Sequence, residues 1–82
     1  MRNDQLTFSD VGSYMRKLRK ELKLSRHDVA RRAKVSPRTI YNIENGCHIP
    51  RIPELARISS VYDMTLMDLF TASSLYYDSL NN

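Results

Sequence analysis

The sequence predicts an all-α domain built from five short helices. Apolar residues recur every three or four positions, as in Val11, Met15 and Leu18, which places them on one side of a helix. Residues that favour helix N-caps, such as Ser25 and Ser36, stand in front of these apolar stretches. No segment of the sequence alternates between apolar and polar residues in the manner of a half-buried strand.

The chain is long enough for one small domain. It has 82 residues, of which 41% are hydrophobic, and a domain of this size is marginally stable alone, so oligomerisation is expected. It has no apolar run near the roughly 20 residues that cross a bilayer, and no secretory signal pattern at its start. The single cysteine, Cys47, excludes an internal disulfide framework and favours a reducing, cytoplasmic location.

Positive charge is concentrated in the first half of the chain. The net charge is +4, and the stretch from Tyr14 to Arg38 contains ten basic residues but only two acidic ones, Glu21 and Asp28. After Ile52 the balance reverses, with one arginine against four acidic residues. This asymmetry indicates either a face that binds a polyanion or an ordinary solvated helix surface, and charge alone leaves both interpretations open.

A first helix is expected to follow a flexible N-terminal arm over residues 1–8. Ser9 or Asp10 suits its N-cap, and the helix runs to about Leu22. Its buried stripe would consist of Val11, Met15, Leu18 and Leu22.

The next two helices are short and separated by a tight turn. Ser25 caps a helix over residues 26–33, and Ser36 caps another that begins with Pro37, whose missing N–H costs nothing at this position. Gly46 suits the left-handed turn that ends a helix. The residues expected to face inward are Val29, Ala30, Ala33, Ile40, Ile43 and Glu44.

A fourth helix is expected over residues 52–62, and a fifth begins at Leu66 after the N-cap Thr65. The domain defined in this way covers residues 9–72. Residues 73–82 form a C-terminal extension that either packs on the first helix or contributes to a dimer interface. In the fourth helix Leu55, Ile58 and Tyr62 are expected to be buried, and the fifth helix carries the apolar residues Leu69 and Phe70.

The outward face of the third helix carries residues that are poor helix formers. Arg38, Tyr41, Asn42 and Asn45 lie there, where a solvated helix would favour Glu, Lys, Gln or Ala. Two short helices joined by a tight turn form a helix-turn-helix, whose second helix lies in the major groove of DNA. There Arg38 would bind guanine O6 and N7, Asn42 would bind adenine N6 and N7, and the Tyr41 ring would meet a thymine methyl group.

Other chemistry is not indicated by the sequence. Cys47 and His48 are adjacent, but zinc needs three or four convergent ligands, and His27 is the only other histidine, so no metal site is expected. Gly-rich phosphate loops and catalytic arrangements of Ser, His, Asp or paired carboxylates do not stand out, so no enzyme, cofactor or small-molecule ligand is expected. The amphipathic basic helix over residues 14–23 needs its apolar stripe for the core, which ranks membrane-surface binding last.

The stretch LSRHDVARRAKVSPRTIYNIENGCHIP, with LRKELK before it and LARISSVYDMTLMDLF after it, resembles the phage-repressor and Cro-like (Xre) helix-turn-helix family. The resemblance runs from about Val11 to Phe70 and implies a five-helix lambda-repressor-like domain. Two positions depart from the family pattern, because Lys34 in the interhelical turn and Asp63 after the fourth helix replace frequent glycines. A non-glycine residue in the left-handed region costs roughly 1 kcal/mol and is tolerated.

The resemblance also implies roles for individual residues. It pairs Arg19 with Glu44 as a largely buried structural ion pair, and it brings Asn45 and the following loop to phosphate through backbone N–H groups. The implied base-reading residues are Pro37, Arg38, Tyr41 and Asn42. The implied contacts to the DNA backbone come from Arg26, Ser36, Thr39, Asn45 and Arg51.

Together these features predict a sequence-specific DNA-binding transcriptional regulator, most simply a repressor. It would bind a pseudo-palindromic operator as a homodimer, with half-sites about 34–36 Å apart. The expected dimer interface is formed by Leu66, Met67, Phe70 and Tyr77. The alternative is a helix-turn-helix protein-interaction module, such as an antitoxin or adaptor, whose activity would not depend on Arg38, Tyr41 or Asn42.

Overall fold

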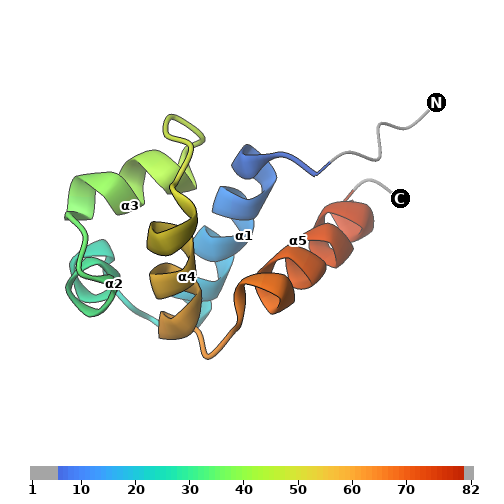
Figure 1. The fold of residues 1–82 in the computed structure, drawn as a ribbon. Helices are drawn as coiled ribbons and strands as arrows, with labels where there is room; N and C mark the ends of the chain where they lie inside the picture. The colour runs from blue at the N-terminus through green and yellow to red at the C-terminus, as the bar shows by residue number, and fades with distance from the viewer. Residues whose placement is uncertain (1–5, 81–82) are drawn as a thin grey trace.

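The computed structural model describes residues 6–80, and this part of the chain forms five α-helices without a β-strand (Figure 1). The helices are α1 (Phe8–Glu21), α2 (Arg26–Ala33), α3 (Pro37–Glu44), α4 (Ile52–Val61) and α5 (Leu66–Leu80). The all-α, five-helix fold expected from the sequence is therefore confirmed. Within the described residues, none of these helices combines the length and the apolar character needed to cross a bilayer.

The helix α1 begins earlier than the sequence indicated. Thr7, rather than Ser9 or Asp10, is the N-cap: its hydroxyl accepts a hydrogen bond from Asp10 N–H, and the Asp10 carboxylate accepts one from Thr7 N–H. This reciprocal pair satisfies two backbone donors at once, which a cap at Ser9 would not do. The arm expected over residues 1–8 therefore overlaps the cap and first residue of α1, and its residues 1–5 lie outside the described part.

The buried stripe of α1 is shorter than expected. Val11 and Met15 are buried and Leu18 is half-buried, but Leu22 is 56% exposed. Leu22 is the C-cap of α1, and the chain turns away directly after it because Lys23 adopts a left-handed conformation with φ 57°. Periodicity therefore identified the stripe but not the residue at which it leaves the core.

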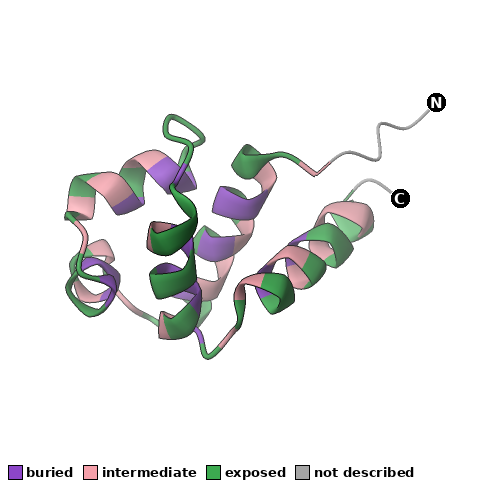
Figure 2. Ribbon diagram, in the orientation of Figure 1, coloured by how far each residue is buried: buried purple, intermediate pink, exposed green. Residues whose placement is uncertain are grey.

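A single hydrophobic core joins all five helices. Figure 2 shows that buried residues face the inside of the bundle on each helix. The helices α2 and α3 pack against each other, and α1 contacts both α3 and α5 (Figure 1). The residues of the core are Val11, Met15, Val29, Ala30, Ala33, Ile40, Ile43, Leu55, Ile58, Tyr62 and Leu69.

The C-terminal extension is not a separate segment, because α5 continues without a break to Leu80. The ring of Tyr76 lies 5.5 Å from that of Tyr14 on α1, and Lys17 Nζ lies 5.4 Å from the Tyr76 ring. Of the two alternatives for residues 73–82, packing on the first helix is the one that Tyr76 follows. As Figure 1 shows, α5 covers the side of α1 opposite to α3.

Candidate nucleic-acid interface

The helix α3 has well-defined ends. The Ser36 hydroxyl accepts a hydrogen bond from Thr39 N–H at 3.1 Å and lies 2.9 Å from the Thr39 hydroxyl, while Pro37 occupies the first turn. At the other end Gly46 adopts the left-handed conformation, with φ 73°. These local interactions explain why eight residues rich in poor helix formers still form a helix.

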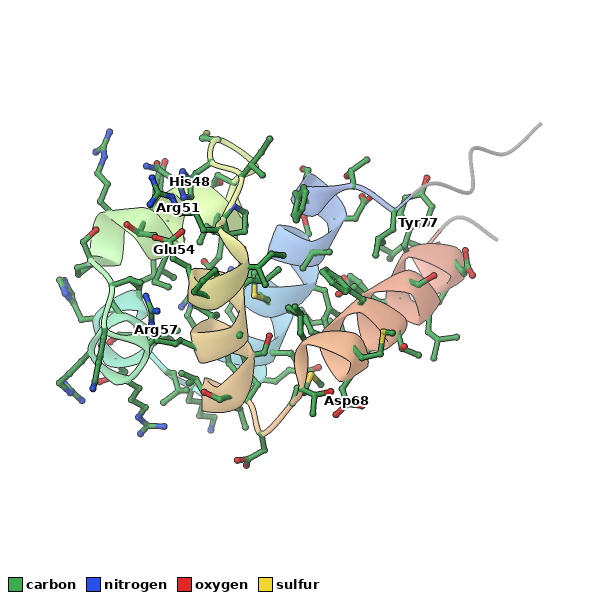
Figure 3. All side chains as sticks on the ribbon, viewed as in Figure 1. His48, Arg51, Glu54, Arg57, Asp68 and Tyr77 are labelled. Carbon is green, nitrogen blue, oxygen red and sulfur yellow. The ribbon has the colours of Figure 1, made fainter. Side chains whose placement is uncertain are left out.

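The turn between α2 and α3 is tight and is anchored from a third helix. Lys34 takes the left-handed conformation expected for it, with φ 58°, and Asp63 does so after α4, with φ 56°. In addition, Arg57 on α4 donates from Nε to the carbonyl oxygen of Ala33 at 2.9 Å (Figure 3). Sequence reasoning missed this role of Arg57, because no local pattern connects residues 24 positions apart.

The outward face of α3 opens to solvent beside α2. Arg38 is exposed, the Tyr41 side chain is 47% exposed, and Pro37 and Asn42 are half-buried. Within the described part of the chain, the side chains of Arg38 and Asn42 form no hydrogen bond or ion pair. A concave surface between the two helices is lined by Arg19, Ser25, Arg26, His27, Pro37, Arg38 and Tyr41.

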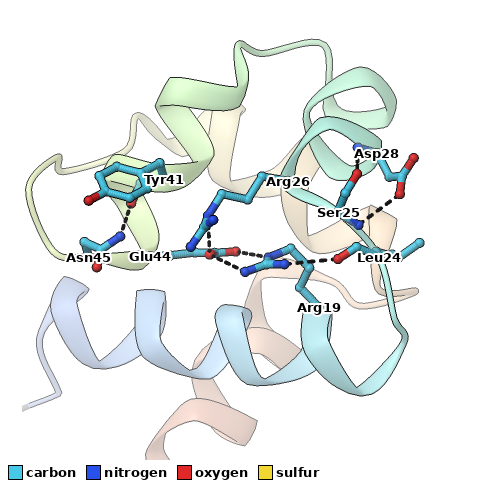
Figure 4. A network of polar contacts seen from close by, with 8 residues as sticks. All are labelled: Arg19, Leu24, Ser25, Arg26, Asp28, Tyr41, Glu44 and Asn45. Atoms are coloured by element: carbon cyan, nitrogen blue, oxygen red, sulfur yellow. Dashed lines mark hydrogen bonds and ion pairs between the residues drawn. The ribbon is translucent and has the colours of Figure 1, made fainter.

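The helix α3 is fixed to α1 by a buried ion pair. Arg19 donates from Nε to Glu44 Oε2 at 2.8 Å and from Nη2 to Glu44 Oε1 at 3.1 Å (Figure 4). A third donor of Arg19, Nη1, reaches the carbonyl oxygen of Leu24 at 3.0 Å. The hydrogen bond to Glu44 raises the pKa of Arg19 above its ordinary value, so the guanidinium stays protonated. The geometry is that of a structural link between helices.

Arg26 is part of the same network, which the sequence did not indicate. Its Nε lies 3.3 Å from Glu44 Oε1, and its guanidinium carbon lies 5.2 Å from the centre of the Tyr41 ring. The terminal amino groups of Arg26 make no hydrogen bond within the described residues, so they remain available to a phosphate. Arg26 therefore has contacts inside the protein in addition to the expected role at the DNA backbone.

The loop after α3 differs from the expectation for Asn45. The N–H groups of Asn45, Gly46 and Cys47 all donate to carbonyl oxygens of α3, at 2.8–3.2 Å, and the Asn45 side-chain amide donates to the Tyr41 carbonyl at 2.8 Å. These groups complete the end of the helix and cannot bind phosphate as they stand. The first N–H groups of the loop without a partner in the described chain belong to His48 and Ile49.

A small polar cluster follows this loop at the start of α4. Glu54 accepts a hydrogen bond from Arg51 N–H at 3.1 Å and lies 3.4 Å from His48 Nε2 (Figure 3). The bond from Arg51 N–H, followed by the proximity of His48, holds the pKa of Glu54 below its ordinary value. The Arg51 side chain is exposed at the start of α4. No group of His, Cys, Asp or Glu in the described residues is placed to hold a metal ion, and Cys47 is a free, exposed thiol.

Comparison with known proteins places this geometry in a family. Residues 15–69, about two thirds of the chain, match the family model described as helix-turn-helix. The chain belongs to the helix-turn-helix family. This confirms the resemblance found in the sequence, and the family is one of DNA-binding transcriptional regulators rather than enzymes. No curated protein sequence matches the chain.

A solved structure shares the fold of this helix-turn-helix protein. The present chain is similar to the crystal structure of the clp gene regulator ClgR from Corynebacterium glutamicum, with a TM-score of 0.81 and 18% sequence identity. The similarity covers 96% of this chain and 83% of the ClgR chain. At this level of identity the likeness establishes the arrangement of the helices.

The residues expected at a dimer interface are divided between the core and the surface of the helix-turn-helix protein. Leu66 and Phe70 pack against its own core, and Tyr77 is half-buried. Met67 is 72% exposed and Leu75 is 67% exposed. The large apolar residues that α5 exposes are therefore Met67, Leu75 and Leu80, which is 64% exposed, rather than the whole expected set.

Proposed function

We propose that this helix-turn-helix protein is a transcriptional repressor that binds a pseudo-palindromic operator as a homodimer. The observation that carries the proposal is the outward face of α3, where Arg38 and Asn42 have no partner within the described chain. Most other polar side chains near this helix, including Arg19, Ser36 and Glu44, are engaged in hydrogen bonds. Side chains left without partners on an ordered helix are suited to binding an external ligand.

The chemistry of these side chains matches the edges of base pairs. Arg38 presents a planar guanidinium that can bind guanine O6 and N7 with two hydrogen bonds, and Asn42 can do the same at adenine N6 and N7. The exposed ring of Tyr41 provides an apolar face for a thymine methyl group. Pro37, which has no N–H, contributes only shape, at the end of the helix nearest to α2.

Contacts to the DNA backbone would surround this face. We assign them to the half-buried Arg26, through its terminal amino groups, to the exposed Arg51, and to the N–H groups of His48 and Ile49 in the loop. The Ser36 and Thr39 hydroxyls are hydrogen-bonded to each other, and whichever of them accepts that bond can still donate its own proton to a phosphate oxygen. Asn45 keeps for this purpose only the second N–H of its side-chain amide, since the first donates to the Tyr41 carbonyl.

Dimerisation would use α5, which covers the side of α1 opposite to α3. Met67 and Leu75 are separated by eight residues, a little over two helical turns, so both lie toward one side of α5. Burying them against a second copy would remove apolar surface from water and place two recognition helices in one particle. A dimer that covers a promoter in this way represses transcription without further machinery. Binding to chromosomal DNA also agrees with the cytoplasmic location that Cys47 favours.

Selection from a pool of random duplexes tests the DNA-binding proposal. We expect enrichment of a motif with two related half-sites, and affinity for it that falls steeply with salt as phosphate contacts release counterions. The variant Arg38→Ala should lose preference at one position of each half-site. If the wild type enriches no motif, or if replacing Arg38, Tyr41 and Asn42 with alanine leaves its activity intact, the protein-interaction module becomes the better interpretation.

Sedimentation equilibrium tests the dimer. The wild type should sediment as a dimer, and Met67→Glu should shift it toward the monomer. Leu22→Glu, which places the same charge at an exposed leucine on α1, should not change the association. A wild-type chain that remains monomeric both free and on a two-half-site duplex would contradict the proposed assembly.

A further inference from the structure

Two side chains from different helices of the motif are in contact at the recognition face. The guanidinium of Arg26, at the start of α2, lies 5.2 Å from the centre of the Tyr41 ring on α3 (Figure 4). This is within the range of about 6 Å at which a guanidinium is attracted to an aromatic face. Tyr41 is otherwise 47% exposed. The contact with Arg26 therefore restricts where this exposed ring can lie.

Arg26 is itself held in place by a buried anion. Its Nε donates to Glu44 Oε1 at 3.3 Å, and the Glu44 side chain is only 2% exposed. The position of that carboxylate is fixed by Arg19, which binds both of its oxygens. Arg26 thus connects a rigid point in the interior to a ring on the surface. A guanidinium can donate to a carboxylate in its own plane while its flat face lies over a ring, whereas an ammonium group has no flat face to stack on the ring.

Arg26 has two separate effects at the surface between α2 and α3: it adds positive charge, and it contacts the Tyr41 ring. Two guanidinium groups, those of Arg19 and Arg26, share the single carboxylate of Glu44, so one positive charge is left over beside the open surface between α2 and α3. This excess charge attracts any phosphate and adds to affinity without regard to sequence. The contact with Tyr41, in contrast, acts on a residue that faces the bases.

We propose that Arg26 is a specificity-determining positioning residue, which holds the Tyr41 ring in the orientation that reads its base pair. The inference rests on the proposed function, since it assigns a further residue to base reading at the same face. A ring already held in place loses less conformational freedom on binding and meets one base step rather than several. The base preference at the position read by Tyr41 should therefore depend on the residue at position 26.

A double-mutant cycle tests this dependence. Arg26→Lys keeps the positive charge but loses the planar stack, and Tyr41→Leu removes the ring while leaving Arg26 and Glu44 paired. The two single variants, the double variant and the wild type are titrated against the selected duplex and against duplexes changed at one base pair. Arg32→Lys is the matched control, because Arg32 is an exposed arginine of α2 without a partner in the described residues.

In the wild-type background, Arg26→Lys should reduce discrimination at one base position by about two- to fivefold, the range of an exposed cation–π pair. In the Tyr41→Leu background, Arg26→Lys should cause no measurable change in discrimination at that base position. Tyr41→Phe, which keeps the ring, should retain the dependence on Arg26. Arg32→Lys should leave discrimination unchanged in every background. The ring resonances of Tyr41 in NMR spectra of the free protein should shift in Arg26→Lys and not in Arg32→Lys.

The outcomes separate this inference from the proposed function. If the wild type enriches a motif and Arg26→Lys preserves its base preference and the Tyr41 ring resonances, the positioning role is wrong and the DNA-binding function stands. Equal weakening of all duplexes by Arg26→Lys would likewise reduce Arg26 to a phosphate contact. If the wild type enriches no motif, the proposed function fails, and the positioning role fails with it.

Discussion

Arg19 on α1 and Glu44 at the end of α3 form a two-bond ion pair in which the side chains are only 8% and 2% exposed. The pair sets the distance between α1 and the C-terminal end of α3. Nearby, the backbones themselves meet, since a Cβ atom on Gly12 would collide with the carbonyl oxygen of Ile43. The position of α3 is therefore fixed both by an ion pair and by direct contact between the backbones of α1 and α3.

Arg19→Met should destabilise the fold by about 3 kcal/mol, because it leaves the buried Glu44 with Arg26 as its one remaining cation. Urea unfolding followed by circular dichroism measures this change. Lys17→Met is the control, since the ion pair of Lys17 with Glu21 lies on the surface and should contribute little. Equal losses in the two variants would show that burial of the Arg19 pair has no special effect.

Gly12→Ala should lower the free energy of unfolding by about 1–3 kcal/mol, the cost of forcing an added methyl group into a packed contact. The carbonyl of Ile43 is backbone and cannot rotate away, so α3 must move as a whole. Operator affinity measured well below the melting temperature should fall as well. Ser13→Ala, on the exposed side of the same helix, should leave both quantities nearly unchanged. An unchanged melting curve for Gly12→Ala would contradict the close approach of α1 and α3.

Arg38→Ala should weaken binding to the preferred operator by about 1–3 kcal/mol and reduce preference at one base position. The reason is the loss of two hydrogen bonds to a guanine, which a water molecule cannot replace with the same geometry. Competition titrations against single-base variants of the operator provide the measurement. Arg32→Ala should leave the preference intact. A uniform loss for all duplexes would mean that Arg38 touches phosphate and not a base.

Tyr62→Phe should protect the fold in alkaline solution. Burial, with a smaller contribution from the nearby Glu44 carboxylate, raises the pKa of Tyr62 from 10.0 to about 12. A raised folded pKa means that the stabilisation is complete below pH 10.0 and is lost as the pH rises to about 12. Near pH 11.5 the wild type should therefore have lost about 2 kcal/mol that Tyr62→Phe retains.

Urea unfolding at neutral pH and near pH 11.5 compares the two proteins under equal conditions. All other ionisable groups are the same in the two proteins, so the difference between them isolates Tyr62. A wild type and a Tyr62→Phe variant that lose stability in parallel would contradict the burial of this phenol.

The boundaries of α2 and α3 were predictable from the sequence because their signals are local. The Ser25 hydroxyl accepts from Asp28 N–H and the Ser36 hydroxyl from Thr39 N–H, three residues on, so the N-caps can be identified from neighbouring residues. The start of α1 was predicted wrongly because a local signal cannot choose between neighbouring candidates for the N-cap. Several capping residues stand close together there, and only the reciprocal bonds of Thr7 and Asp10 choose among them.

The candidate site was predictable in its composition but not in its connections. The outward residues of α3 follow from helical periodicity, and the sequence placed Arg38, Tyr41 and Asn42 on one face. It did not show that the N–H groups of Asn45 and its neighbours are used within the helix end. Nor did it show that Leu66 and Phe70 pack against their own core.

The sequence by itself determined the number of helices, their order, their inward faces and the chemistry displayed on the recognition helix. Each of these depends on residues within about one or two turns of one another. The tertiary structure alone decided that Arg26 contacts Glu44 and Tyr41 and that Arg57 binds the Ala33 carbonyl. These contacts join residues 15, 18 and 24 positions apart, and they exist only because packing brings the helices that carry them to a particular distance and angle.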